Sequence, residues 1–410
     1  MYANNQFTTN LINSNSIEIC DQFYEHIIIS GSNPYDRGVS YGRQVKQKII
    51  ANIDYYKNCG IFDDWPAVRR YIDDHYVSAL KQYYPSGLAE MEGIANGADC
   101  LVEDIIMLNA RYDLSRWSRH LNLQKKQQQQ QPQECTGAVC LSTATNDGDV
   151  LIGQNWDINR RIMVDNIAVL LEIYPDPDEG IAPFFMFTEA GQLGRSGMNA
   201  NGLGLVAMGL FASDEQYDDN GAQYLPVTLL RRMFIEAPSF SVALKRVTWL
   251  PRHVAVNMLV ATAEDEAINI ELTATNVFIS YPSIKTGIYT HSNHFKSKGY
   301  LCSSSGVKDI NRFASSLFRD RQLEKELTKR WPNIDDQSFV DSFKNHLGYP
   351  DSLCLHVPNK GKERSSTSPN ECTVANIVYN LTKRTVRLCK GSPCAGVYRE
   401  YRFSKSITNN

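Results

Sequence analysis

Hydrophobic residues recur with different periods in the two parts of this chain. Before residue 124, apolar residues are spaced by three and four positions, which places them on one face of a helix. Residues that break helices, such as Pro85 and Gly93, divide this pattern into separate segments. We therefore predict helices at residues 39–53, 65–84, 88–98 and 102–114.

From residue 137 onwards, short apolar runs bounded by turn residues are typical of strands. The sequence NDGD at 146–149 favours a hairpin turn between the first two. Because strands often follow one another directly, the order favours antiparallel sheets with helices outside them over a parallel doubly wound sheet. Strands are predicted at 137–143, 150–155, 166–174, 184–189, 202–208, 255–262, 267–273, 372–380 and 385–389, and helices at 227–236, 240–247 and within 309–346.

A polar segment rich in glutamine, residues 124–133, separates the two parts. Low complexity of this kind predicts a solvated loop. We expect a polar N-terminal extension at 1–30, a helical segment at 31–134 that ends in this loop, and a strand-rich segment at 135–410. The last two segments together are expected to form one domain.

Composition and charge exclude several classes of partner. The 410 residues carry a net charge of -3, so no basic excess indicates nucleic acid or an acidic membrane surface. No uncharged apolar run approaches the roughly 18 residues of a membrane span. The polar start, MYANNQFTTNLINSNS, lacks the apolar core of a secretion signal. These features predict a soluble, cytoplasmic protein.

The ten cysteines are scattered and include no CxxC pair, which argues against a disulfide scaffold and against a zinc ribbon. We expect most of them to be buried free thiols, and we predict no metal ion and no cofactor. The cysteines are Cys20, Cys59, Cys100, Cys135, Cys140, Cys302, Cys354, Cys372, Cys389 and Cys394.

Cys135 stands out among them because it follows the glutamine-rich loop and opens a predicted strand. If the peptide bond between Glu134 and Cys135 were cut, Cys135 would gain a free α-amino group. An amine with a pKa near 8 can act as general base for its own thiol at neutral pH, without a histidine. The position therefore fits an N-terminal cysteine nucleophile.

Motifs along nearly the whole chain, from about 31 to 401, carry a resemblance to a known family. Each motif is weak alone, but their number and order are specific. The motifs are GSNPYDRGVSYGRQ (31–44), YYPSGLAEMEGIANGADCLVEDIIMLNARYDL (83–114), CTG (135–137), GQNWD (153–157), EAGQLGRSGMNANGLGL (189–205), THSNHF (290–295), SSLFR (315–319) and KGSPC (390–394). With these motifs, the chain resembles the acyl-coenzyme A:isopenicillin N acyltransferase family of N-terminal nucleophile hydrolases, which includes an N-β-alanyl-dopamine hydrolase.

The resemblance implies an α+β fold, a four-layer αββα sandwich with two antiparallel sheets. It also implies cleavage into an α-chain that ends at Glu134 and a β-chain that begins at Cys135, the nucleophile. Asp157 matches the aspartate that holds the new amine, and Asn293 matches a donor to the oxyanion. Arg319 matches an arginine expected to favour the thiolate and anionic substrate groups.

The same resemblance implies an amidohydrolase or acyltransferase that acts on C–N bonds of small N-acyl compounds, with acyl-coenzyme A as a possible partner. The two chains of the precursor are expected to stay associated. The alternative is an unprocessed homologue of the same fold that is inert or only binds ligands. Neither nucleic acid nor a membrane is expected as a partner.

Two positions depart from the family pattern. Relatives usually carry glycine before the nucleophile, where a strained backbone is expected, whereas this chain has Glu134. Some relatives place an asparagine on the strand after the glycine-rich turn, whereas residues 206–210 read VAMGL here. We therefore expect either slow cleavage or cleavage at another bond followed by trimming. We also expect a backbone N–H in place of the missing side-chain donor.

Other chemistries fit the sequence less well. A papain-type pair could use His294 or His356 with a cysteine, but no CGSCW-like segment lies near any of the cysteines. His291 and His294 have a helical i, i+3 spacing that could bind a metal, but YTHSNHF is more typical of a strand end or turn. The glycines at 202–205 lack the strand–GxGxxG–helix context of a dinucleotide site.

Overall fold

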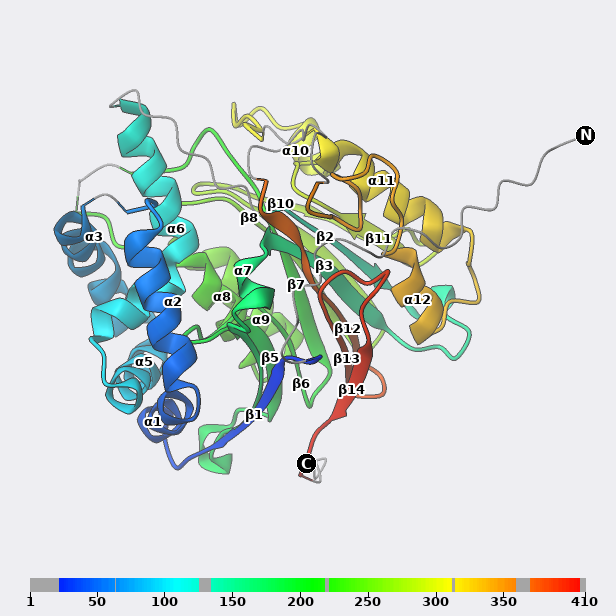
Figure 1. The fold of residues 1–410 in the computed structure, drawn as a ribbon. Helices are drawn as coiled ribbons and strands as arrows, with labels where there is room; N and C mark the ends of the chain where they lie inside the picture. Colours follow the sequence, from blue (N-terminus) through cyan, green and yellow to red (C-terminus); the bar gives the residue numbers. More distant parts are fainter. Residues whose placement is uncertain are drawn as a thin grey trace, which may run out of the picture.

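Two β-sheets lie face to face, with helices on the outer side of each, so the chain forms four layers (Figure 1). This computed structural model describes residues 22–62, 64–124, 134–217, 221–311, 314–358 and 369–405. The α+β class and the αββα order predicted from the resemblance are confirmed. The glutamine-rich segment from 125 to 133 lies outside the described residues.

The larger sheet has eight strands in the order β1-β4-β5-β6-β7-β8-β9-β10. All its neighbours pair antiparallel except the edge strand β1, which runs parallel to β4. Strand β1 also corrects the expected N-terminal extension, since the last six of those residues form this strand. The strands are β1 (Glu25–Ser30), β4 (Ala168–Tyr174), β5 (Phe184–Glu189), β6 (Ser196–Asn199), β7 (Leu203–Gly209), β8 (Val256–Thr262), β9 (Glu266–Leu272) and β10 (Val277–Ser280).

The smaller sheet has six strands in the order β11-β2-β3-β12-β13-β14, and all of its neighbours are antiparallel. Strands β2 and β3 are paired neighbours, as the NDGD turn predicted. The strands are β11 (Ile288–His291), β2 (Glu134–Cys140), β3 (Leu151–Asn159), β12 (Glu371–Asn380), β13 (Thr385–Lys390) and β14 (Tyr398–Arg402).

Helices of the first half of the chain cover the larger sheet, together with α8 and α9, whereas α11 and α12 cover the smaller sheet (Figure 1). The helix predicted at 65–84 forms as α3, a π-helical turn η1 and α4 in succession. The helices are α1 (Pro34–Gln44), α2 (Lys46–Asn58), α3 (Trp65–Tyr71), η1 (Ile72–Val77), α4 (Ser78–Tyr83), α5 (Pro85–Ala98), α6 (Val102–Gln124), α7 (Arg161–Val164), α8 (Val227–Ile235), α9 (Phe240–Trp249), α10 (Lys298–Leu301), α11 (Ser315–Thr328) and α12 (Asp336–Ser342).

The layers are held together by separate apolar clusters, one for each interface. Strand β5 shows how the alternation of a strand supplies two of them. Phe184 and Met186 face the helices, whereas Phe185 and Phe187 face the smaller sheet. A third cluster lies between the smaller sheet and helices α11 and α12. Strands buried on both faces explain why the central runs are almost continuously apolar.

Glycines of two family-like motifs allow helices α1 and α5 to pack closely. A methyl group on Gly38 would lie 2.1 Å from the carbonyl oxygen of Glu90, and one on Gly93 would lie 2.1 Å from that of Tyr35. No side chain fits at such distances, so the backbones of the two helices are in contact. This contact fixes the helical layer against which the rest of the fold is built.

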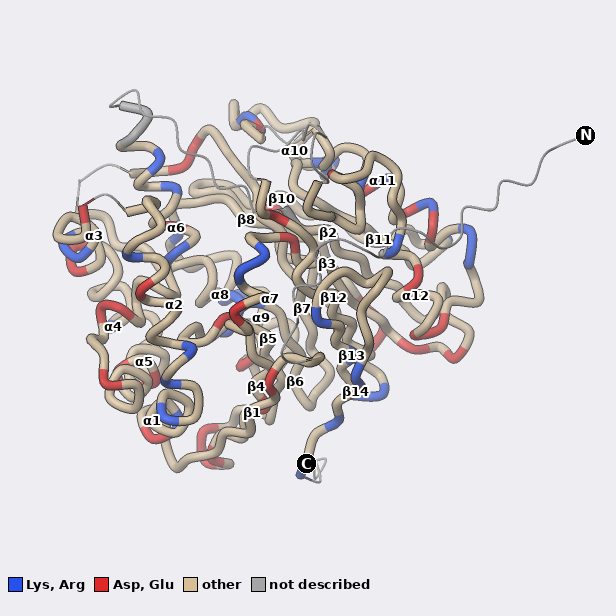
Figure 2. Tube along the Cα trace, in the orientation of Figure 1, with Lys and Arg blue, Asp and Glu red and all other residues tan. Residues whose placement is uncertain are grey.

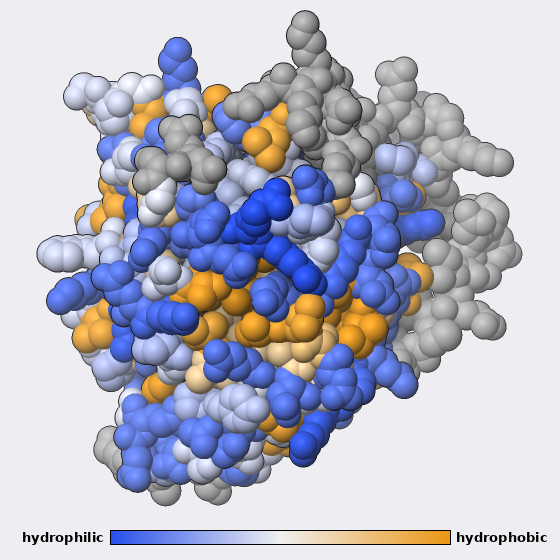
Figure 3. Space-filling model, turned by 90° about the vertical axis from the view of Figure 1, so that its left-hand side faces the viewer, coloured by the Kyte–Doolittle hydropathy of each residue, from blue (hydrophilic) through white to orange (hydrophobic). Residues whose placement is uncertain are grey.

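The surface has no strong bias towards one charge. Basic and acidic residues are interspersed through the layers of the trace (Figure 2). Seen from the side of α2 and α3, hydrophilic groups surround a central band of apolar side chains (Figure 3). None of the described helices combines the length and apolarity needed to cross a membrane.

Candidate active site

Cys135 lies at the second position of β2, and its side chain points into the space between the two sheets. Strand alternation gives Val139 the same direction, whereas Ala138 and Cys140 face α11 and α12. Only 2% of Cys135 is exposed. Its thiol is therefore enclosed by the sandwich, at the end of the strand that the sequence singled out.

Two predicted site residues hold the backbone of Cys135 on both sides. The N–H of Cys135 donates to Oδ1 of Asn293 over 2.9 Å. Nη1 of Arg319 donates to the carbonyl oxygen of Cys135 over 2.9 Å and to Oγ1 of Thr136 over 2.6 Å. Nη2 of Arg319 donates to Oδ1 of Asn293, also over 2.9 Å. The structure thus brings together residues from β2, the turn after β11, and α11.

The orientation of the Asn293 amide follows from its partners. Its Oδ1 accepts from two certain donors, so its Nδ2 is directed the other way, to the carbonyl oxygen of Gly209 at 2.9 Å. Oγ of Ser316, in α11, accepts from the backbone N–H of Asn293 over 2.8 Å. The SSLFR motif therefore positions both the backbone and the side chain of this asparagine.

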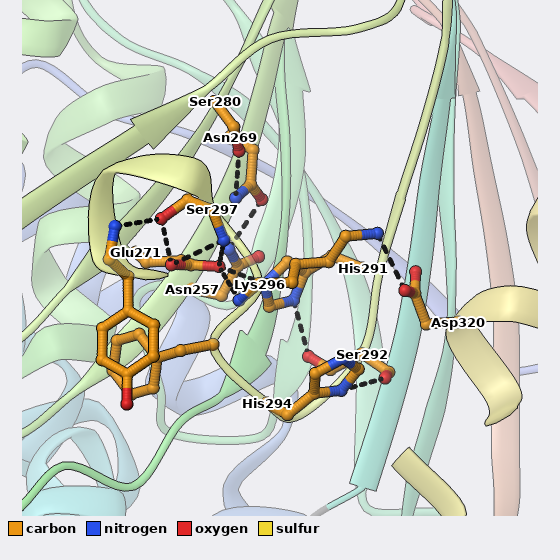
Figure 4. A network of polar contacts seen from close by, with 12 residues as sticks. Asn257, Asn269, Glu271, Ser280, His291, Ser292, His294, Lys296, Ser297 and Asp320 are labelled. Atoms are coloured by element: carbon orange, nitrogen blue, oxygen red, sulfur yellow. Dashed lines mark hydrogen bonds and ion pairs between the residues drawn. The ribbon is translucent and has the colours of Figure 1, made fainter. Parts of the chain in front are cut away.

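The turn that carries Asn293 is anchored by a buried carboxylate in β9 (Figure 4). Glu271 accepts hydrogen bonds from Nε2 of His291 at 3.0 Å, from the backbone N–H of Lys296 at 2.8 Å and from Oγ of Ser297 at 2.7 Å. Burial alone would raise the pKa of Glu271, but these donors hold it below its usual value. Lys296 in turn pairs with Asp320 of α11 at 2.8 Å.

Asp157 lies in β3 directly opposite Glu134, the residue before Cys135. Its Oδ1 accepts from Oγ1 of Thr373 in β12 over 2.6 Å, and its backbone N–H bonds to the Cys135 thiol. Asp157 is therefore buried on the strand next to the peptide bond whose cleavage the sequence predicted. Asp157, Asn293 and Arg319 all meet at Cys135.

Two further arginines act on the thiol. Nη2 of Arg195 lies 3.6 Å from Sγ of Cys135, and its guanidinium stacks 3.8 Å above the ring of Trp156. Arg231, from α8, acts on the same sulfur electrostatically. Burial raises the pKa of the Cys135 thiol, and both positive charges oppose that rise. Burial also lowers the pKa of Arg195 to about 9 and lowers that of Arg231.

Comparison with known proteins identifies the family of the chain. The model of the family described as acyl-coenzyme A:6-aminopenicillanic acid acyl-transferase matches residues 143–395, more than half of the chain. The chain belongs to this acyl-transferase family. The match begins after Cys135, so it does not by itself assign the nucleophile.

One curated relative extends this acyl-transferase match over almost the whole chain. The 40 kDa form of acyl-coenzyme A:6-aminopenicillanic-acid-acyltransferase from Emericella nidulans is 26% identical over 369 residues, which cover 88% of this chain and 92% of that protein. Solved structures with similarity include a conjugated bile acid hydrolase from Clostridium perfringens, at 12% identity and a TM-score of 0.41, with 67% of this chain and 99% of that chain covered. A penicillin V acylase from Agrobacterium tumefaciens has 10% identity and a TM-score of 0.41, with coverages of 66% and 87%.

The helical first half of the chain builds one wall of the site. Arg111 of α6 forms an ion pair with Glu189, and Oδ1 of Asn109 accepts from the N–H of Leu193 over 2.8 Å. Both partners belong to the glycine-rich segment that carries Arg195. The LNARYDL motif (108–114) and the EAGQLGRSG motif (189–197) therefore contact each other. This contact positions Arg195 next to the sulfur of Cys135.

Sequence reasoning missed Arg195 and Arg231. Arg195 lies inside a quoted motif, but a lone arginine in a glycine-rich turn does not reveal where it points. Arg319 was expected to favour the thiolate, whereas its described hydrogen bonds go to Asn293, Thr136 and the Cys135 backbone. The arginine in contact with the sulfur is Arg195.

The structure also places the residues of the competing interpretations. Nδ1 of His294 lies 2.8 Å from Oγ of Ser316, and His356 lies beside Cys354 and Cys394. His291 is bonded to Glu271, so its spacing to His294 reflects the turn after β11. The glycine-rich segment continues into the antiparallel strands β6 and β7, which is not the context of a dinucleotide site.

The backbone of Glu134 is extended, as the first residue of β2. Any residue adopts this conformation, so the described backbone at this position does not require the glycine found in relatives. The VAMGL stretch, which lacks the asparagine of some relatives, contributes the Gly209 carbonyl that binds Asn293.

Proposed function

We propose that this acyl-transferase is a self-processing enzyme whose nucleophile is the thiol of Cys135. The observation that supports it best is the set of contacts around Cys135. Asn293 accepts a hydrogen bond from its N–H, Arg319 donates one to its carbonyl oxygen, and Arg195 faces its sulfur. Hydrolysis of the Glu134–Cys135 bond would convert this N–H into an α-amine. Oδ1 of Asn293 would then already be in position to accept a hydrogen bond from that amine, and Asp157, on the strand next to Glu134, is proposed to hold the amine in place.

In the proposed reaction, the α-amine accepts the thiol proton, directly or through one water, and the thiolate attacks the carbonyl carbon of an amide or thioester. The carbon–sulfur bond forms and the negative charge moves to the carbonyl oxygen. One N–H of Asn293 Nδ2 donates to the Gly209 carbonyl, and its second N–H, together with nearby backbone N–H groups, is proposed to stabilise this oxyanion. The leaving amine or thiol takes the proton as its bond to carbon breaks, which leaves a thioester on Cys135.

The acyl group then passes to water or to an amine, and the α-amine again accepts the proton of the attacking group. Water makes the enzyme an amidohydrolase and an amine makes it an acyltransferase. Both reactions suit small N-acyl compounds, and acyl-coenzyme A would supply a thioester to the same thiol. Within the described part of the chain, neither Arg195 nor Arg231 forms an ion pair with a carboxylate. We therefore propose that they bind an anionic group of the substrate.

The two products of cleavage, 1–134 and 135–410, are proposed to remain associated. The Arg111–Glu189 ion pair and the Asn109–Leu193 hydrogen bond join the helical part to the strand-rich part inside the fold. These contacts do not depend on the peptide bond at residue 134. The cytoplasmic location expected from the sequence is part of the same proposal.

The test compares purified wild type with Cys135→Ala and Cys140→Ala by intact mass, N-terminal sequencing and turnover of N-acyl amino acids and amines, with and without acyl-coenzyme A. Cys140 is the matched control, because it lies in the same strand with its side chain on the opposite face. Wild type and Cys140→Ala should give two fragments, one beginning at Cys135, and should be active. Cys135→Ala should be a single inactive chain.

Two outcomes contradict the proposal in different ways. A fully processed and active Cys135→Ala would exclude this thiol as the nucleophile. An uncut, inactive wild type would support the alternative, an unprocessed homologue that is inert or only binds ligands. In that case Glu134, in place of the glycine of relatives, would explain the lack of cleavage.

A further inference from the structure

Four side chains with metal-binding atoms converge on one point outside the Cys135 site. His346, Cys354 and His356 lie between α12 and β12, and Cys394 lies in the loop after β13. One ligand atom from each residue lies within 4.8 Å of the other three. Cys354 is buried and His346 is at the surface, so the cluster lies at the edge of the fold with one side open.

The separations of these atoms match the size of a tetrahedral site. Nε2 of His356 lies 3.0 Å from Nε2 of His346, 3.4 Å from Sγ of Cys354 and 3.6 Å from Sγ of Cys394. Around a tetrahedral Zn²⁺, bonds of about 2.3 Å to sulfur and about 2.0 Å to nitrogen place neighbouring nitrogens about 3.3 Å apart. The same bonds place sulfur and nitrogen about 3.5 Å apart.

We propose that His346, Cys354, His356 and Cys394 bind a structural Zn²⁺ ion. Two thiolates and two imidazoles in tetrahedral arrangement are a donor set typical of zinc, whereas Mg²⁺ and Ca²⁺ prefer oxygen. All four positions are filled by the protein, which is the arrangement of a structural ion and not of a catalytic one. A disulfide between Cys354 and Cys394 is the competing interpretation. It would leave no group that both imidazoles bind, so it would not explain why their nitrogens lie so close together.

The ion would join two loops that are distant in the sequence, and it would do so next to the active site. Leu355, between two of the ligands, donates its N–H to Oγ1 of Thr373 over 2.9 Å and accepts from the N–H of Thr373 over 3.0 Å. The same Oγ1 donates to Asp157 over 2.6 Å. Zinc would therefore hold the strand-like segment that supports Asp157. Zinc binding itself does not rest on the proposed catalytic function.

The experiment measures zinc by plasma mass spectrometry in protein purified without chelators. Wild type is compared with the double variant Cys354→Ser/Cys394→Ser and with the matched control Cys59→Ser/Cys302→Ser, whose cysteines lie outside the cluster. About one zinc ion per chain is expected in wild type and control, and less than about one tenth of that in the cluster variant. Cys135→Ala should retain its zinc, so failure of the catalytic proposal would leave this result unchanged.

A second measurement does not depend on how the variants fold. Wild type prepared without zinc is titrated with Co²⁺, which reports tetrahedral thiolate coordination through its visible absorption. Absorption that saturates at about one Co²⁺ per chain, and that weakens in His346→Ala, supports the site. Wild type that binds neither metal overturns the proposal, as does zinc retained by the cluster variant or a disulfide between Cys354 and Cys394 found by peptide mapping.

Discussion

The backbone N–H of Cys135 donates a hydrogen bond of 2.9 Å to the side-chain oxygen of Asn293, a residue 158 positions further along the chain. The other end of the same amide donates to the carbonyl of Gly209. The Asn293 side chain thus has two roles. Its Oδ1 is an acceptor for the nitrogen that cleavage would convert into an amine, and its Nδ2 is a donor to the last residue of β7. These two functions can be separated by substitution.

Asn293→Asp keeps the oxygen that accepts from Cys135 and Arg319 but loses the Nδ2 donor. If this donor stabilises the oxyanion, kcat should fall about 10²–10³-fold while the protein remains folded. The measurement is steady-state turnover beside a thermal unfolding curve. Unchanged kcat in a folded Asn293→Asp protein would restrict Asn293 to holding the backbone of Cys135.

Arg319→Lys should weaken the hydrogen bonds that hold the Cys135 backbone. A single ammonium group cannot replace the planar guanidinium, which donates to Cys135, Thr136 and Asn293 together. The buried acceptors left without donors should lower the free energy of unfolding by about 2–4 kcal/mol. Arg321→Lys on the same helix is the matched control, since Arg321 is exposed and pairs with Glu324. Its effect should stay within about 0.5 kcal/mol. Equal effects of the two substitutions in denaturant titrations would refute this account of Arg319.

Arg195→Gln should make the Cys135 thiol harder to ionise. The positive charge of Arg195 opposes the rise in pKa that burial causes, so its removal should move the pKa of the thiol further upward. The pH of half-maximal inactivation by iodoacetamide should therefore increase. Exposed Arg43 gives the control substitution Arg43→Gln. A midpoint that stays in place, or moves to lower pH, would contradict the assigned role of Arg195.

Asp113 of α6 should make stability depend on pH. Burial raises its pKa to about 7, although the N–H of Val227 and the charges of Arg231 and Arg116 oppose the rise. Because the pKa in the folded state lies above the ordinary value, the stabilisation is complete below about pH 4 and is lost as the pH rises through 7. Asp113→Asn, which is always neutral, should therefore gain about 1–3 kcal/mol relative to wild type between pH 5 and pH 9. A stability difference that does not vary with pH would contradict the raised pKa.

The hydrophobic pattern predicted the central strands and helices α5, α8 and α9 within a few residues. It ended the longest helix, α6, at 114 instead of 124 and predicted α1 and α2 as one helix. It also missed the strands at the sheet edges. The missed strands β1, β10, β11 and β14 are the four edges of the two sheets. An edge strand has a neighbour on one side only and carries more polar residues, as the burial of β14 shows. The short strand β6 is buried, but its sequence SGMN gave the pattern of a turn.

The sequence alone determined the layers, because the periods of apolar residues decide which faces of helices and strands must be buried. It also singled out Cys135, Asp157, Asn293 and Arg319, through motifs whose order resembles one family. Only the tertiary structure decided that Arg195 faces the sulfur and that Cys394 joins His346, Cys354 and His356. Local pattern records whether a side chain is buried, whereas its neighbours depend on how distant segments pack, and no spacing along the chain encodes that.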